Sequence, residues 1–134
     1  FGPIMAWAAL TNSFDIRPVL LGGVVWLLIA ANDMVYAIQD LVFDRTEGLK
    51  SIPAVLGVDK TIVVARTCHL VAFTLLLVLG YLEQMSFTYY VGAILLAMVY
   101  IYYHSEKRNP ERTFHQCNLL GGLIMLTSTA VAVL

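Results

Sequence analysis

The stretch NDMVYAIQDLVFDRTEGLKSIPAVLG, residues 32–57, places three aspartates directly after an apolar run that is long enough to cross a bilayer. A carboxylate close to hydrocarbon loses hydration that apolar neighbours do not replace, so acids at such a place are costly. Ionisable residues in this setting usually serve a function. The stretch therefore predicts a membrane fold and a candidate site at one end of it.

The composition supports a membrane setting. The 134 residues are 60% hydrophobic and only 13% charged, with a mean hydropathy of +0.80. An ordinary soluble domain carries about 25% charged residues. The net charge of −1 offers no basic surplus to pair with phosphate backbones, so nucleic acid is excluded as a partner.

Apolar runs alternate with short polar breaks along the chain. A hydrocarbon core of about 30 Å requires roughly 20 residues of helix, and four runs approach that length: 18–40, 61–82, 87–103 and 114–134. Residues 1–10 read as the end of a further helix. We expect an all-α, polytopic transmembrane bundle with four full spans and a partial one. No signal peptide is recognisable behind Phe1, so the chain is expected to begin partway through a larger protein.

The basic residues predict the orientation. Four successive spans put segments 40–60 and 104–113 on one side, and Arg17 alone lies on the other. The positive-inside rule then places the aspartate stretch in the cytoplasm. Cys68 and Cys117 fall near that reducing side without metal-ligand spacing, so they are interpreted as packing residues rather than a disulfide. The basic residues on the cytoplasmic side are Arg45, Lys50, Lys60, Lys107, Arg108 and Arg112, with Arg66 just inside the adjoining helix.

The spacing of the acids suggests a shared face. If one helix continues through the stretch, Asp33, Tyr36, Asp40 and Asp44 lie within a narrow stripe. Asp40 and Asp44 are then one turn apart, and like charges at this spacing repel, so a cation is expected between them.

Magnesium is the natural candidate for that cation. It prefers oxygen ligands and is usually held by one or two carboxylates together with phosphate oxygens of the substrate. A carboxylate pair at a membrane face thus suggests a lipid diphosphate. The alternative is a solvated loop in which Asp44 pairs with Arg45 or Lys50 and the acids cap a helix end.

The full pattern resembles a known family. It reads Asp33-x-x-Tyr36-x-x-Gln39-Asp40-x-x-x-Asp44-x-x-x-Gly48-x-Lys50-Ser51-Ile52-Pro53. This is similar to the second aspartate-rich motif of the UbiA-type intramembrane aromatic prenyltransferases, especially the 4-hydroxybenzoate polyprenyltransferase branch. Three further patterns also resemble this family: Ala6-Trp7-x-Ala9-x-Thr11, Ala65-Arg66-x-x-His69 and Phe114-x-x-x-Asn118.

The resemblance implies a nine-helix bundle with two aspartate-rich motifs facing each other across a cytoplasmic cavity mouth. Residues 1–134 look like its carboxyl-terminal half, and the first motif, N-D-x-x-D-x-x-x-D, does not occur in them. The implied activity is transfer of a polyprenyl group from an allylic polyprenyl diphosphate to an aromatic acid such as 4-hydroxybenzoate. This reaction belongs to ubiquinone or menaquinone biosynthesis, in a bacterial inner membrane.

The same resemblance implies roles for individual residues. Asp40 and Asp44 would hold Mg²⁺, while Asp33 would bind it less directly or orient the acceptor. Lys50 could reach a phosphate or, equally well, anionic lipid headgroups. Tyr36 could shield a cation with its ring face or anchor the chain at the interface.

Arg66 lies well inside a predicted span, where a charged residue is expected to have a function. It could pair with diphosphate, with the acceptor carboxylate or with an aspartate. It could also extend to the cytoplasmic interface. His69 is expected to be a hydrogen-bonded core residue, and Asn118 to make an interhelical hydrogen bond or contact substrate. Gly121-Gly122 suggests close helix approach. Interfacial anchoring and packing are expected of Tyr89, Tyr90, Tyr100, Tyr102 and Tyr103.

Two other classes remain open on the residues alone. A transporter also places acids at a cavity mouth, but it more often shows broken helices or a charge at the membrane midplane. A non-enzymatic membrane scaffold is favoured by the absence of the first motif. As an enzyme, the protein would have a polyprenyl diphosphate, an aromatic acid and membrane lipid as its partners.

Overall fold

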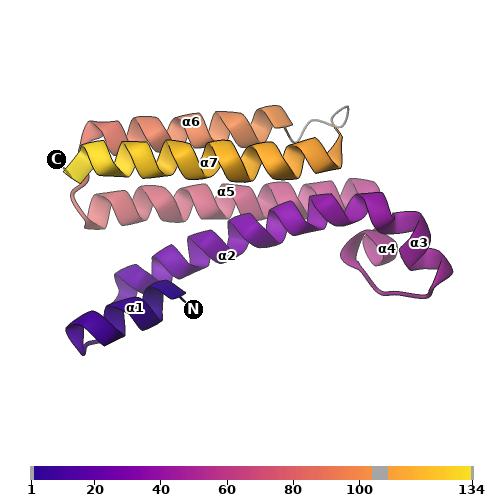
Figure 1. The fold of residues 1–134 in the computed structure, drawn as a ribbon, viewed down its shortest axis with the longest axis horizontal. Coiled ribbons are helices and arrows are strands. Elements are labelled where there is room, and N and C mark those ends of the chain that lie inside the picture. Colours follow the sequence, from indigo (N-terminus) through magenta and orange to yellow (C-terminus); the bar gives the residue numbers. More distant parts are fainter. Residues whose placement is uncertain (1, 104–108, 134) are drawn as a thin grey trace.

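The computed structural model describes residues 2–103 and 109–133, and every element in these ranges is helical. Figure 1 shows four long helices side by side: α2 (Ile16–Tyr36), α5 (Val58–Leu82), α6 (Phe87–Tyr103) and α7 (Pro110–Val133). The short helix α1 (Gly2–Thr11) lies against α2 near the amino-terminal end of α2. The predicted all-α bundle is confirmed.

Two helices of the described residues are long and apolar enough to cross a membrane, namely 16–46 and Val58–Leu82. The third predicted span is α6, whose apolar part Phe87–Tyr102 is shorter. The fourth falls in α7, which begins at Pro110 rather than at Phe114. The predicted cytoplasmic residues 104–108, including Lys107 and Arg108, lie outside the described residues.

The start of α2 follows from its sequence. The Asp15 side chain caps the helix by accepting a hydrogen bond from the backbone N–H of Arg17, at 2.9 Å. Pro18 occupies the first turn, where its missing N–H leaves no intrahelical bond unmade.

The long helices form a closed ring in which α2 packs on α5, α5 on α6, α6 on α7 and α7 on α2. Small residues permit the close approach, as expected where lipid supplies no hydrophobic drive for association. A Cβ on Gly92 would lie 2.1 Å from Ser128 Oγ on α7. A Cβ on Gly80 would lie 2.5 Å from the ring of Tyr89, whose hydroxyl donates to the Leu76 carbonyl at 3.0 Å.

The predicted close approach at Gly121-Gly122 holds for the first glycine. A Cβ on Gly121 would lie 3.0 Å from Leu96 Cδ1, whereas a Cβ on Gly122 would have no heavy atom within 4 Å. Gly121 therefore packs against α6, and Gly122 faces open space. Cys117 is fully buried beside this contact, and among the described residues neither Cys68 nor Cys117 forms a disulfide, as predicted.

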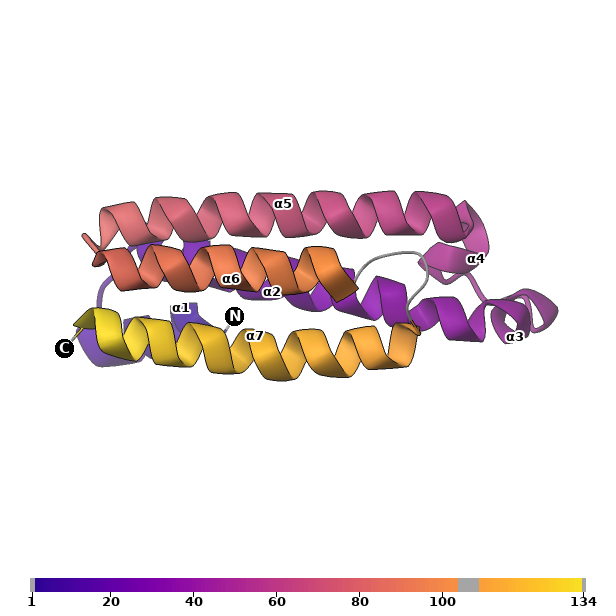
Figure 2. The same ribbon diagram turned by 90° about the horizontal axis from the view of Figure 1, so that it is seen from above.

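Three short elements follow α2: η1 (Ala37–Asp40), α3 (Leu41–Thr46) and α4 (Ile52–Leu56). Figure 2 shows α3 and α4 together at one end of the bundle, opposite the end where α7 finishes. Gly48 has φ +68° just after α3, a left-handed conformation that glycine adopts without strain. Ser51 then caps α4 by accepting a hydrogen bond from the Ala54 N–H at 3.3 Å. Gly48 and Ser51 of the motif therefore each have a structural role: Gly48 adopts a left-handed conformation after α3, and Ser51 caps α4.

Candidate functional site

The three aspartates do not share one uninterrupted α-helix. The α-helical pattern ends at Tyr36, and Ala37–Asp40 forms a 3₁₀ turn before α3 begins. A 3₁₀ turn advances about 20° more per residue than an α-helix, so four residues rotate the following helix by about 80°. The expectation of a single stripe through Asp44 is therefore wrong. Asp33 and Asp40 are exposed, whereas Asp44 faces inward with 8% exposure.

The main chain at Asp44 closes the loop after α3. The backbone carbonyl oxygen of Asp44 accepts a hydrogen bond from the Leu49 N–H at 2.8 Å. Within residues 2–103 and 109–133, the ion pairs join Arg17 to Asp15 and Glu83, and none reaches Asp44. The alternative in which Asp44 pairs with Arg45 or Lys50 is thus wrong for this structure.

The capping alternative also fails. Asp40 occupies the N-cap position of α3, but its side chain makes no capping hydrogen bond. A carboxylate at a helix start usually accepts a bond from the first turn. Among the described residues, Asp40 and Asp44 therefore lack an ion-pair partner, and Asp40 makes no capping hydrogen bond.

The acidic residues are compared with two kinds of metal site: one built wholly from protein side chains, and one completed by phosphate oxygens and water. In the part of the chain that the structure describes, no three side chains of His, Cys, Asp or Glu lie close enough together to hold a metal ion. A cage built wholly from these residues is therefore excluded. Magnesium sites that are completed by phosphate oxygens and water need only one or two carboxylates, and the side chains of Asp40 and Asp44 are donors of that type.

A buried polar network lies beside Asp33. The Asn32 amide is 1% exposed, and its Nδ2 donates to Asn118 Oδ1 at 2.9 Å and to the Tyr100 hydroxyl at 3.3 Å. The network joins α2, α6 and α7. The interhelical hydrogen bond predicted for Asn118 is confirmed, while its contact with substrate stays a prediction.

One turn further along, the Tyr36 ring packs on Phe114 with centroids 4.9 Å apart. Helix α2 is thus fastened to α7 on both sides of Asp33, at Asn32 and at Tyr36. Sequence analysis missed Asn32, although an amide immediately before Asp33 in an apolar run was a signal. Tyr100 was interpreted as one of several anchors and packing residues, and its hydrogen bond to Asn32 was not foreseen.

Arg66 is on α5, one residue after Ala65, which packs against Ala31, Met34 and Val35 of α2. It is exposed on α5 and lines a pocket of about 330 Å³ together with His69, Phe73 and Tyr100. His69 is a buried residue, as predicted, and its ring lies 4.5 Å from that of Tyr100. Lys50 is exposed between α3 and α4. Lys50 is not among the residues that line the pocket with Arg66.

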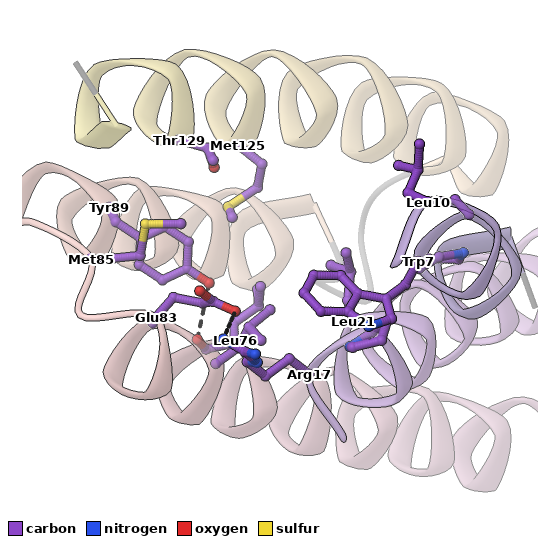
Figure 3. Close-up of a pocket in the computed structure, with 15 residues that line it drawn as sticks. Trp7, Leu10, Arg17, Leu21, Leu76, Glu83, Met85, Tyr89, Met125 and Thr129 are labelled. Carbon is purple, nitrogen blue, oxygen red and sulfur yellow. Dashed lines mark hydrogen bonds and ion pairs between the residues drawn. The ribbon is translucent and has the colours of Figure 1, made fainter. Parts of the chain in front are cut away.

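The opposite end of the bundle holds a larger cavity, of about 450 Å³. Figure 3 shows Arg17 and Glu83 facing each other at its rim, with Trp7 and Leu21 along its wall. Arg17 pairs with Asp15 as well, and its hydrogen bonds lower the pKa of Asp15 from 3.8 to about 2. Because these acids have a cation, this end differs from the aspartate stretch.

Together these features define an integral membrane protein of helical-bundle type, in which Asp40 and Asp44 at one end of the bundle have no cationic partner among residues 2–103 and 109–133. The chain belongs to the UbiA prenyltransferase family, whose sequence profile matches residues 1–127.

Curated relatives extend the comparison. The chain is 31% identical over 127 residues to a 4-hydroxybenzoate octaprenyltransferase of Tolumonas auensis, covering 90% of this chain and 43% of that protein. It is 30% identical over 119 residues to the protein of the same name from Marinobacter nauticus, with 82% and 38% covered. A third, from Psychromonas ingrahamii, is 28% identical over 116 residues, with 81% and 38% covered.

The chain therefore spans about two fifths of the length of the curated relatives it matches. No solved structure matches it.

Proposed function

We propose that this protein transfers a polyprenyl group from an allylic polyprenyl diphosphate to an aromatic acid, with 4-hydroxybenzoate as the acceptor. The observation that carries the proposal is the pair Asp40 and Asp44: within the described part of the chain neither has a cationic partner, and Asp40 makes no capping hydrogen bond. Family membership and relatives named 4-hydroxybenzoate octaprenyltransferase support the same reaction. The product would enter quinone biosynthesis, of ubiquinone or menaquinone.

The reaction exchanges one bond for another. The bond between the allylic carbon and the diphosphate oxygen breaks, a carbon–carbon bond forms to the aromatic ring, and the ring loses a proton. Bound Mg²⁺ would neutralise the departing diphosphate, which is the Lewis-acid role of a metal. Asp40 and Asp44 would hold the ion, with Asp33 as a more distant ligand or an orienting group for the acceptor.

Other residues would act on the substrates. Lys50 is exposed between α3 and α4, where a flexible ammonium can meet a phosphate. Tyr36 is exposed one turn from Asp33 and would present its ring face to the allylic cation. Arg66 would bind the carboxylate of the aromatic acid from the pocket that it shares with His69 and Phe73, and Asn118 would lie close to the bound substrate.

The described carboxylates form one wall of a site. Since a diphosphate held through metal ions needs ligands around the cluster, we propose that these residues act with a first aspartate-rich motif on another part of the complete protein. The chain would then be the carboxyl-terminal half of the catalytic bundle. The proposed location is the bacterial inner membrane, with residues 41–60 on the cytoplasmic side.

The test uses the complete protein, meaning this chain together with a polypeptide that carries the first motif. Membranes containing it are incubated with octaprenyl diphosphate, Mg²⁺ and a panel of aromatic acids, and the prenylated acids are measured by mass spectrometry. We expect a product with 4-hydroxybenzoate and none after chelation of divalent ions. The 134-residue chain alone is expected to insert without transferring a prenyl group. Absence of product with every acid would refute the proposal.

A further inference from the structure

Two contacts fix the register of α2 and α7, which run antiparallel in Figure 1. Asn32 on α2 bonds to Asn118 on α7. Four residues after Asn32, the Tyr36 ring packs on Phe114, which lies four residues before Asn118. Residues four apart lie on the same face of a helix, so the two contacts hold one face of α2 against one face of α7. The position of the Asn118 side chain relative to α2 is therefore fixed.

The hydrogen bonds of Asn32 also fix the orientation of the Asn118 amide. Asn32 is 1% exposed, and its Nδ2 donates to Asn118 Oδ1 at 2.9 Å and to the Tyr100 hydroxyl at 3.3 Å. An asparagine amide carries one oxygen that accepts hydrogen bonds and one NH₂ group that donates two. Since the oxygen of Asn118 faces Asn32, the NH₂ group of Asn118 is turned away from Asn32.

The NH₂ group of Asn118 is available for a ligand. Among the described residues, the Asn118 side chain makes one hydrogen bond, the bond that its oxygen accepts from Asn32. Asn118 is exposed and borders a cavity of about 250 Å³ with apolar neighbours such as Leu28 and Ile29. Polar groups without partners are costly in an apolar setting, and polar side chains inside membrane helices usually serve a function. Two N–H donors are thus placed where an oxygen atom of a bound molecule can accept from them.

The position of Asn118 favours the aromatic acceptor over the diphosphate as that molecule. Its partner Asn32 directly precedes Asp33, the aspartate proposed to orient the acceptor. Asp40 lies eight residues beyond Asn32, which is roughly 12 Å along a helix axis. A hydrogen bond spans only about 3 Å. A diphosphate held at Asp40 and Asp44 is therefore farther from Asn118 than an acceptor held at Asp33.

We infer that Asn118 donates a hydrogen bond to an oxygen atom of the aromatic acceptor, and that Asn32 is a positioning residue that turns the Asn118 amide toward it. The inference rests on the proposed function. Because Asn32 is buried, it acts through Asn118 and does not touch the substrate. Its role requires a side chain that donates to Asn118 Oδ1, and leucine, with a similar volume, supplies no donor.

The experiment compares Asn32→Leu, Asn118→Leu and the double variant in the complete protein, with 4-hydroxybenzoate and octaprenyl diphosphate as substrates. KM for each substrate and kcat are measured in membranes that contain matched amounts of folded protein. We expect the acceptor KM to rise about tenfold in each single variant, the scale of one hydrogen bond to a charged group, while the donor KM stays near that of the parent. The double variant should resemble Asn118→Leu, because Asn32 acts only through Asn118.

Asn118→Asp separates the orientation of the amide from the contact between the helices. An aspartate keeps an oxygen that accepts from Asn32 and replaces the N–H donors with a second oxygen. Its acceptor KM should therefore rise although the bond to Asn32 is retained. Thr127→Val is the matched control on α7, because Thr127 bonds only to carbonyl groups of its own helix. Both KM values of this control should equal those of the parent protein.

An unchanged acceptor KM in the two leucine variants would overturn the inference, as would additive increases in the double variant. A purely structural role would lower the amount of folded protein without raising the acceptor KM. A rise in the donor KM alone would place the diphosphate at Asn118 and overturn the assignment of the acceptor. If Asn32→Leu is not folded, the acceptor KM of Asn118→Asp decides alone. Failure of the parent protein to form product would instead refute the proposed function.

Discussion

The acidic residues at the two ends of the bundle differ in their ion-pair partners. At the end where α2 begins, Asp15 and Glu83 both contact Arg17, whose guanidinium also lies 5.3 Å from the ring centre of Trp7. At the other end, Asp40 and Asp44 have no such partner among the described residues. Both sets of acids follow or precede apolar helices, so composition alone does not separate them. An acid with a cation in its own chain is structural, and an acid without one is a candidate ligand for an external cation.

Neutralising one acid at each end gives the largest expected difference. In the complete protein, Asp44→Asn should lower prenyl transfer by about 100-fold or more, the scale on which a single electrostatic group of a catalytic site acts. Asp15→Asn should leave transfer near the parent level, because Asp15 pairs with Arg17 and caps α2 at the other end of the bundle, and asparagine also caps helices. Rates are measured at saturating donor with expression matched by immunoblot. Comparable activity in the two variants would remove the distinction between the ends.

The two ends should also face opposite sides of the membrane. A cysteine at Thr46 should react with an impermeant reagent only after the membrane is opened, whereas a cysteine at Ser13 should react in sealed cells. Cys68 and Cys117 are replaced by serine and alanine beforehand, because both are free thiols. Labelling of the Thr46 position in sealed, right-side-out cells would reverse the assigned orientation.

A smaller effect is expected from the network that fastens α2 to α7. Asn32→Ala should destabilise the bundle by about 0.6 kcal/mol, the average for interhelical hydrogen bonds in membranes. Asn118→Ala should cost less in the Asn32→Ala background than alone, because the two amides share a bond. Thr127→Ala is the control, since Thr127 bonds only to its own helix backbone. Additive unfolding free energies in detergent would contradict the shared bond.

The smallest effect concerns pH at the Arg17 end. Because the folded-state pKa of Asp15 is lowered from 3.8 to about 2, its ionised form stabilises the fold above pH 3.8. That stabilisation should fade as the pH falls from 3.8 through 2, and it is lost below pH 2, where Asp15 becomes protonated in both states. Thermal unfolding of Asp15→Asn should therefore differ from the parent at pH 6 and converge with it only below pH 2. A difference independent of pH would point to packing rather than charge.

The sequence was sufficient to predict the positions of most helices in the bundle. Helix periodicity, apolar length and the position of Pro18 depend on neighbours along the chain, so the helices now observed at α1, α2, α5 and α6 were predicted to within a few residues. The family resemblance, carried by the acids and the glycine, serine and proline that follow, agrees with the profile match. The role of each acid in the reaction stays a prediction.

The geometry of the aspartate stretch was not predictable in the same way. The 3₁₀ turn at Ala37–Asp40 has no glycine or proline to mark it, and it decides that Asp44 turns inward while Asp40 stays exposed. In the fold, η1 contacts α4, which begins 12 residues after η1 ends. A contact of that kind is not visible in the local sequence.

The sequence by itself determined that this protein is a helical membrane bundle with acids at one end, because apolar length, charge placement and motif spacing are local properties. Only the tertiary structure decided which polar residues meet. Asn32 and Asn118 are 86 positions apart, and their bond exists because α2 and α7 close the ring.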